Sequence, residues 1–153
     1  MIDPTVTTNF LALESLLIAH LTAQLADLSP KPKVLSAVDL AGVAEEQQFT
    51  PAVHVVYKGY RIAESRIDGK AARIVQTWLA VVATRNVRQA RTGEAARGDA
   101  GLIARRVLAA LMGHRPAGAA GPLRLVDGPE AGFSAGYQYL PLAFTVELAL
   151  SNP

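Results

Sequence analysis

Arginine is the residue type whose spacing in this chain could do recognition chemistry. The stretch ATRNVRQARTGEAARGDAG, residues 83–101, has almost no large apolar side chain. Its four arginines are Arg85, Arg88, Arg91 and Arg97. A guanidinium makes paired, planar hydrogen bonds to carboxylates and phosphates, so the stretch could bind an acidic protein surface, an anionic ligand or a nucleic acid.

Three readings of this stretch remain open from its composition. The plainest is a solvated loop. Docking on another protein comes next, because arginine is enriched at protein interfaces. Nucleic-acid contact is the least favoured, because residues 85–97 contain no aromatic side chain for stacking and Glu94 and Asp99 dilute the charge.

Other side chains that could do chemistry are too scattered to form a site. The three histidines, His20, His54 and His114, have no metal-binding spacing, and the chain has no cysteine for a thiolate site, a disulfide or a nucleophile. Glu45 and Glu46 are adjacent and would not share a helix face. The cluster Gly-Ala-Ala-Gly at 118–121 lacks the Lys-Ser/Thr of a phosphate-binding loop. We therefore expect no catalytic residue, cofactor or metal, and no enzyme.

The composition is that of a folded domain. The chain has 153 residues, half of them apolar and 18% charged, which fits a single α+β domain over residues 1–153. Its formal charge is only +2 although its pI is about 9.2, so the basic character is local. The N-terminus has no basic region typical of a signal peptide. The first apolar run, 10–28, is interrupted by polar residues and is not expected to span a membrane.

Periodicity predicts a helix over residues 10–28. Apolar residues recur there at steps of three or four, with Thr8 or Asn9 as a cap and Ser29-Pro30-Lys31-Pro32 as the stop. The stripe is Phe10, Leu13, Leu17, Leu21, Leu25 and Leu28. Further apolar residues lie on other faces, so we expect cover on more than one side, for example by a neighbouring subunit.

The next segment predicts a short strand and then a hairpin. Residues 33–39 could form the strand, and 40–48 is ambiguous. A second strand follows Pro51, with Val53, Val55 and Tyr57 on one face. Gly59 predicts a bulge or bend, and Asp68-Gly69 predicts a hairpin turn. Residues 72–84 should then form a central strand covered on both sides, since both of its faces are apolar.

The second half of the chain predicts a helix and further strands. Gly93, Gly98 and Gly101 favour a loop, so the helix is expected from about 100 to 112 with Asp99 as its cap. Its expected buried face is Leu102, Ile103, Val107, Ala110 and Leu111, with Arg105 and Arg106 solvated. A strand over 123–126 follows, and residues 137–150 alternate like a half-buried strand, at an edge or bulged at Pro141. Antiparallel strands with two packed helices make an α+β fold.

The layout of the chain resembles the tail terminator proteins of long-tailed bacteriophages, of the Mu-like and lambda types. The resemblance depends on "WLAVVATRNVRQA", on "AGLIARRVLAALMGHRPAGAAGPLRLVDG" with its Leu-x-Gly-x-Arg-Pro turn, and on "YQYLPLAFTVELAL". The first helix and the "TPAVHVVYKGYRI" hairpin fit the same order, so the likeness covers nearly the whole chain, weakest over 30–50. His114 departs from the aromatic residue that the family often has there.

The resemblance implies a structural virion protein without catalysis or cofactor. Such a subunit assembles as a homohexameric ring that caps the head-proximal end of the tail tube and stops its polymerisation. Its partners would be its own copies, the tail tube protein and the head–tail connector proteins. It would assemble in the host cytoplasm and reside at the neck end of the tail, with no membrane partner. The genome would pass through the ring without specific contact.

Two rival functions stay open from the residues. Another neck or tail-completion protein, such as a head–tail connector, would share the small α+β fold and ring assembly. A nucleic-acid-binding module would use the arginine stretch, and its affinity would fall steeply with salt. In the terminator reading, the loop from Arg85 to Arg97 would instead reach a neighbouring subunit, the tube or the connector.

Overall fold

The computed structural model of the chain describes residues 9–37, 50–85, 94–134 and 136–152. The ambiguous stretch 40–48 lies outside them. The helices are α1 (Leu13–Gln24) and α3 (Glu94–Leu111). The strands are β1 (Lys33–Ser36), β2 (Ala52–Ser65), β3 (Ala71–Arg85), β4 (Arg124–Val126), β5 (Gly132–Ser134) and β6 (Tyr137–Ser151).

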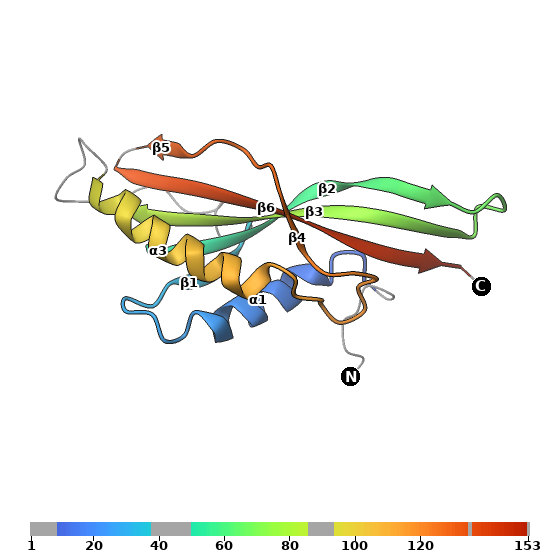
Figure 1. The fold of residues 1–153 in the computed structure, drawn as a ribbon, viewed down its shortest axis with the longest axis horizontal. Helices are drawn as coiled ribbons and strands as arrows, with labels where there is room; N and C mark the ends of the chain where they lie inside the picture. Colours follow the sequence, from blue (N-terminus) through green and yellow to red (C-terminus); the bar gives the residue numbers. More distant parts are fainter. Residues whose placement is uncertain (1–8, 38–49, 86–93, 135, 153) are drawn as a thin grey trace.

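The described strands form one mostly antiparallel sheet. Its order is β1-β2-β3-β6-β4, and β5 also pairs with β6. The pair β1–β2 is parallel and all other pairs are antiparallel. Both helices lie beside the sheet, while β2, β3 and β6 continue past α1 as a long projection (Figure 1). This arrangement confirms the predicted α+β fold.

The hairpin of β2 and β3 has the predicted bulge and turn. Tyr57 is paired with Trp78 and Gly59 with Thr77, so Lys58 is an extra residue in β2. Gly59 has a φ of 137°, which side chains of L-amino acids rarely adopt. Gly69, with a φ of 74°, closes the turn through its N–H, which donates to the carbonyl of Arg66 at 2.9 Å.

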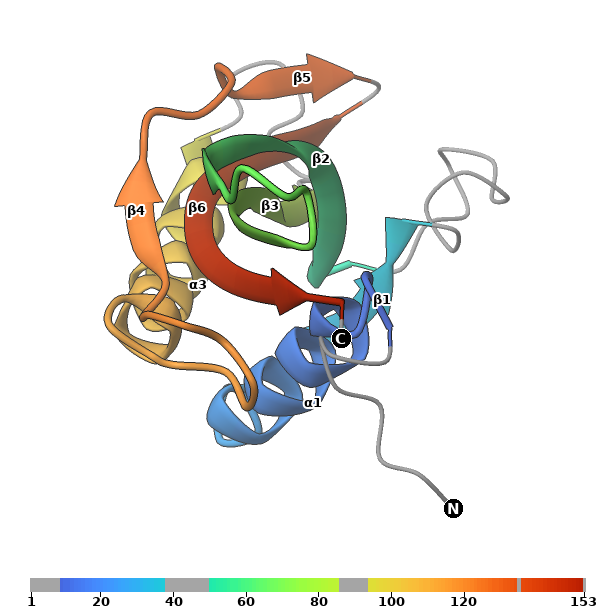
Figure 2. The same cartoon turned by 90° about the vertical axis from the view of Figure 1, so that its right-hand side faces the viewer.

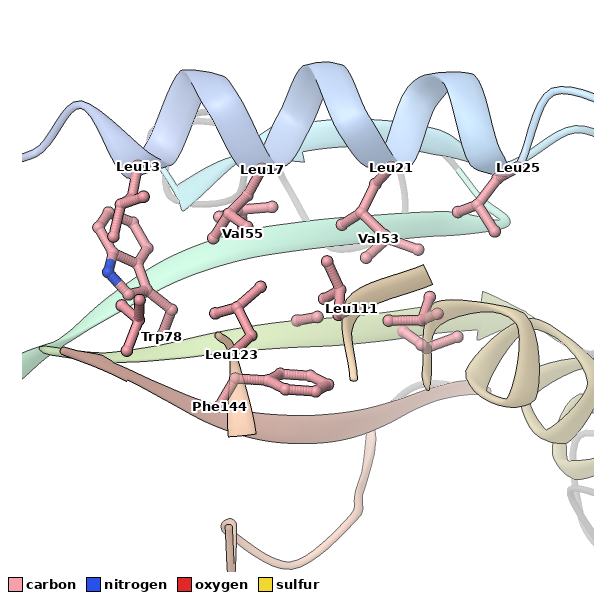
Figure 3. Close-up of a cluster of buried hydrophobic side chains, with 14 of the residues drawn as sticks. Leu13, Leu17, Leu21, Leu25, Val53, Val55, Trp78, Leu111, Leu123 and Phe144 are labelled. Carbon is pink, nitrogen blue, oxygen red and sulfur yellow. The ribbon is translucent and has the colours of Figure 1, made fainter. Parts of the chain in front are cut away.

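The core lies between the two helices and one face of the sheet. The predicted stripe of α1 packs there, with Leu13, Leu17, Leu21 and Leu25 all buried and facing the valines of β2 (Figure 3). The predicted cap is wrong, because α1 begins after Ala12 and has no side-chain cap. Asn9 instead accepts a hydrogen bond from the Leu11 N–H at 2.9 Å, in the turn that leads into the helix. On the other faces of α1, Leu16 and Ile18 are half-buried against the core.

A buried polar chain ties α1 to the centre of the sheet. Trp78, only 1% exposed, donates its indole N–H to Gln76 Oε1 at 3.0 Å. The Gln76 amide then donates to the backbone carbonyl of Phe10 at 2.8 Å. Because buried polar groups are costly unless they are paired, this chain fixes where α1 begins relative to β3.

The central position of β3 is confirmed, but its two faces differ. It lies between β2 and β6, and the core occupies the face of Trp78. On the opposite face Ala83 is buried and Leu79 is 9% exposed, whereas Val75 and Val81 are half-buried. That face is therefore covered only in part, since the core formed with α1 and α3 lies on the face of Trp78.

The predicted start of the second helix is wrong, and its predicted buried face is confirmed except at Leu102. α3 begins at Glu94 rather than near 100, so Asp99 lies inside the helix and is not its cap. A glycine in a helix costs only about 1 kcal/mol relative to alanine, and the alanine-rich surroundings of Gly98 offset it. Leu102 is 70% exposed. Ile103, Val107 and Leu111 are buried as predicted and Ala110 is half-buried against the core, while Ala100 and Ala104 are buried in addition.

The C-terminal strand is present as predicted, its burial alternates over residues 144–149, and it accommodates its proline at a local edge. β6 pairs with β3 along its whole length, and Pro141 is opposite Val81 without a register shift. On its other side, β5 pairs with residues 137–139 and β4 with residues 143–145. In the described part of the chain no strand pairs with Pro141 on that side. The missing N–H of proline is tolerated there.

Candidate interaction surfaces

The titratable side chains support structure rather than chemistry. His20 and His114 stack with ring centroids 3.7 Å apart, and His20 Nε2 donates to the carbonyl of Ala110 at 2.9 Å, since a carbonyl only accepts. Burial and the neighbouring His20 lower the pKa of His114. His54 is buried on β2, away from both. Among the described residues, no three His, Asp or Glu side chains group as metal ligands.

The described carboxylates near the hairpin turn serve local ion pairs. Asp68 accepts from Arg66 Nε at 2.7 Å and from the Lys70 N–H at 3.0 Å. The hydrogen bond from Arg66, followed by that from the backbone, lowers the pKa of Asp68. Glu64 pairs with Arg73 at 3.4 Å. These contacts stabilise the turn, and they are not an acid–base arrangement.

The predicted arginine stretch does not form one loop. Arg85 ends β3 and is exposed, with its guanidinium 5.0 Å from the centre of the buried Tyr137 ring. Arg88 and Arg91 lie outside the described residues. Arg97 belongs to α3, so the loop is shorter than predicted. The structure therefore describes the two ends of the stretch, with Arg85 on β3 and Arg97 on α3.

A hollow of about 220 Å³ lies beside Arg85. Its walls come from the segment after α1, the start of β2, the end of β3 and α3. Arg85 and Asp99 line it together with apolar side chains such as Ile103 and the exposed Leu102. It combines one cation and one carboxylate with an apolar wall, and it opens where the arginine stretch leaves the sheet.

A first exposed surface is the end of the β2–β3 hairpin, residues 58–73, which we call the arm. Figure 1 shows these strands running past the helices to the turn. Tyr60 and Ile62 are 57% and 54% exposed, and Ile67 at the turn is fully exposed. Such large apolar side chains grouped at one end of a molecule are typical of a contact surface.

A second exposed surface is residues 124–134, which we call the β4–β5 edge. It consists of two three-residue strands whose residues are all exposed, joined by a turn. Leu125, Val126 and Phe133 are 44%, 38% and 59% exposed. Asp127 and Glu130 lie in the turn between the strands, and both are exposed. In Figure 2, β4 and β1 lie on opposite flanks of the molecule.

Neither surface was singled out from the sequence. The alternation in Tyr60-Arg61-Ile62 has the pattern of a half-buried strand, so it signals a strand without revealing that the helices end before it. Phe133 sits among glycine and serine and gives no periodic signal. Within the described ranges, neither helix is long and apolar enough to cross a bilayer.

Comparison with known proteins shows the family of the chain and a likeness of fold to a solved structure. The family described as phage tail terminator protein matches residues 6–152 of the chain. Among solved structures, a chain of the "Virion of native gene transfer agent (GTA) particle" has a TM-score of 0.55 and 16% sequence identity. That likeness covers 90% of this chain and 94% of the other. A search of curated proteins gives no match.

Proposed function

The chain belongs to the phage tail terminator family, and we propose that it forms a six-fold ring that caps the head-proximal end of a tail tube. The family is one of structural proteins, so the chain is a structural component of a phage-type virion. In the proposed role the ring stops polymerisation of the tube and offers its other side to the head–tail connector. The observation that carries this proposal is the family match over residues 6–152, which supports one terminator-like domain over 1–153.

The physical character of the surface supports assembly rather than catalysis. Exposed apolar side chains lie both on the arm and on the β4–β5 edge. A closed ring built from one repeated contact needs two different surfaces on every subunit, since each copy contacts one neighbour with each. The gene transfer agent chain, whose fold this chain shares, comes from a virion particle, which is consistent with the proposed assembly.

Tail length is the direct test of the terminator role. Particles that lack the gene for this chain should make tubes of uncontrolled length, and supplying the chain should restore one length in electron micrographs. The purified chain should also show a hexamer-sized species by light scattering over a range of concentrations. Tails of unchanged, uniform length in the absence of the chain would contradict the proposed function.

The arginines are proposed to contact a partner in this assembly. Arg85 is exposed at the end of β3, and its neighbours in sequence carry the remaining charges. Replacing Arg85, Arg88, Arg91 and Arg97 by glutamine should leave the subunit folded and weaken assembly onto the tail. Unaltered ring formation and tail length would rule out this role. A salt-dependent affinity for DNA that disappears in the same variant would favour the nucleic-acid reading.

A further inference from the structure

We propose that the arm of one subunit docks on the β4–β5 edge of a second copy of the chain. This contact would be the repeated one that closes the ring, so the inference rests on the proposed function and specifies its interface. Three independent features of the two surfaces carry it: open strand edges, exposed apolar side chains and opposite charge.

The first feature is the open backbone edge on each surface. β1 pairs only with residues 52–55 of β2, so in the described structure the rest of β2 has no strand on the side away from β3. At the other end of the sheet, β4 and β5 pair with β6 and with no further described strand. Unpaired N–H and C=O groups at such edges are satisfied when a strand of another chain is added.

The second feature is the apolar surface that such pairing would bury. The arm exposes Tyr60, Ile62 and Ile67, and the β4–β5 edge exposes Leu125 and Phe133. Aromatic side chains are enriched at protein interfaces, where they supply large contact areas. The two surfaces present one aromatic ring each, flanked by aliphatic side chains.

The third feature is charge. The arm carries five basic residues, Lys58, Arg61, Arg66, Lys70 and Arg73, against the two carboxylates Glu64 and Asp68. Both carboxylates already pair within the arm. Lys58, Arg61 and Lys70 carry no ion pair in the described part of the chain. The β4–β5 edge has the opposite balance, with Asp127 and Glu130 against Arg124.

The charge pattern also selects the geometry of the contact. Two arms docked on each other would bring like charges together, which disfavours a two-fold dimer through this surface. Docking of an arm on the edge of the next copy brings opposite charges together and is heterologous. Heterologous contacts generate rings when the rotation between copies closes. The arm projects beyond the helices, so it is free to reach a neighbour (Figure 1).

Charge exchange tests this pairing. The double variant Arg61→Glu/Lys70→Glu and the double variant Asp127→Lys/Glu130→Lys should each weaken self-association at least about tenfold, measured by light scattering at fixed ionic strength. Their combination in one chain should restore most of it. Arg105→Glu is the matched control, because Arg105 is exposed on α3 and forms no ion pair with a described residue; it should leave association unchanged. Absence of restoration in the combined variant contradicts the pairing.

Cross-linking gives a second readout that does not depend on affinity. The chain has no cysteine, so Ile62→Cys/Val126→Cys introduces the only thiols. Mild oxidation should join copies into a covalent ladder that ends at the ring. The control Ile62→Cys/Ala23→Cys, with an exposed position on α1, should give none.

The outcomes separate this interface from the proposed function. Rings that assemble without the Ile62–Val126 cross-link and without charge restoration overturn the interface and leave the terminator role standing. A cross-link from the arm to the tube protein alone also overturns it. The interface is also overturned if the purified chain stays monomeric and the chain in assembled tails gives no covalent ladder. Failure of the terminator role would appear instead as tails of unchanged, uniform length in particles that lack the chain.

Discussion

The two halves of β2 are built alike and used differently. Residues 52–55 are all buried, with Val53 and Val55 facing the leucines of α1, whereas residues 60–65 are all exposed. Both halves pair with β3 in the same antiparallel sheet. What changes along the strand is the cover provided by the helices, and with it the role of each apolar side chain.

This contrast separates residues that stabilise the fold from residues available for contact. Ile74 on β3 is 2% exposed, whereas its cross-strand partner Ile62 is 54% exposed. Both members of this cross-strand pair are therefore isoleucines, but one lies in the core and the other at the surface. Free energy of burial is gained at Ile74 during folding, and at Ile62 it becomes available only when another surface covers the arm.

The largest expected effect is at Trp78. Trp78→Ala should lower the free energy of unfolding by about 3–5 kcal/mol, because it leaves a cavity between α1 and the sheet. It also removes the donor bonded to Gln76 Oε1. Denaturant unfolding measures the change. Tyr60→Ala, on the exposed half of β2, is the control and should cost less than about 1 kcal/mol. An unchanged midpoint for Trp78→Ala would contradict the buried central strand.

The paired isoleucines give the sharpest version of the comparison. Ile74→Ala should lower the free energy of unfolding by about 2–5 kcal/mol and Ile62→Ala by less than about 1 kcal/mol. Thermal or denaturant melts of the two variants measure the difference. Ile62→Ala should reduce self-association instead. Equal losses of stability would show that the arm is covered within the subunit and would contradict this prediction.

A smaller effect on stability depends on pH and comes from His114, which lies in the part of the molecule covered by the helices. Burial and His20 lower the pKa of His114 below its ordinary value of about 6.5. Below that pH the unfolded chain binds the proton more readily than the folded chain, so stability falls as the pH drops and is fully present above it. His114→Gln should flatten this fall. The melting temperatures of both proteins between about pH 8 and 5 provide the test; parallel curves would count against it.

The smallest expected effect is at the ion pair between α3 and the segment that follows α1. Arg106 donates to Asp27 Oδ1 at 2.6 Å and to the carbonyl of Gln24 at 3.0 Å. The hydrogen bond from Arg106 is the main cause that lowers the pKa of Asp27. Arg106→Gln should raise that pKa toward its ordinary value and barely change the melting temperature, because the pair is solvated. An NMR titration of Asp27 follows the change, with Arg105→Gln as the matched variant that should leave it unaltered.

Local sequence patterns predict the elements that depend on neighbouring residues in the chain. The stripe of α1, the bulge at Gly59, the turn at Gly69 and the alternation of β6 follow from periodicity and glycine chemistry, and all are present. The predicted start of α3 is wrong because a glycine inside a sequence does not by itself end a helix, and α3 includes Gly98. Leu102 is exposed because the core contacts the side of the helix that carries Ala100 and Ala104, which depends on tertiary packing.

The exposed surfaces of the arm and of the β4–β5 edge could not be predicted from the sequence, for a different reason. Whether Tyr60 and Ile62 are covered depends on how far α1 extends along β2, and β2 is distant from α1 in the sequence. The charges of the arm and of the β4–β5 edge are unremarkable along the sequence, and they become complementary only as two surfaces of one fold. The arginine stretch, conspicuous by composition, stays a proposal because Arg88 and Arg91 lie outside the described residues.

The extra residue at Lys58 has a consequence for how many copies complete a circle. A bulge increases the local twist of a strand and changes its direction. This bulge lies where the covered half of β2 ends and the arm begins, so it sets the angle at which the arm leaves the body. If the arm binds the next copy, that angle determines the rotation from one subunit to the next. Removing Lys58 would then alter the circumference of the assembly while leaving both contact surfaces intact.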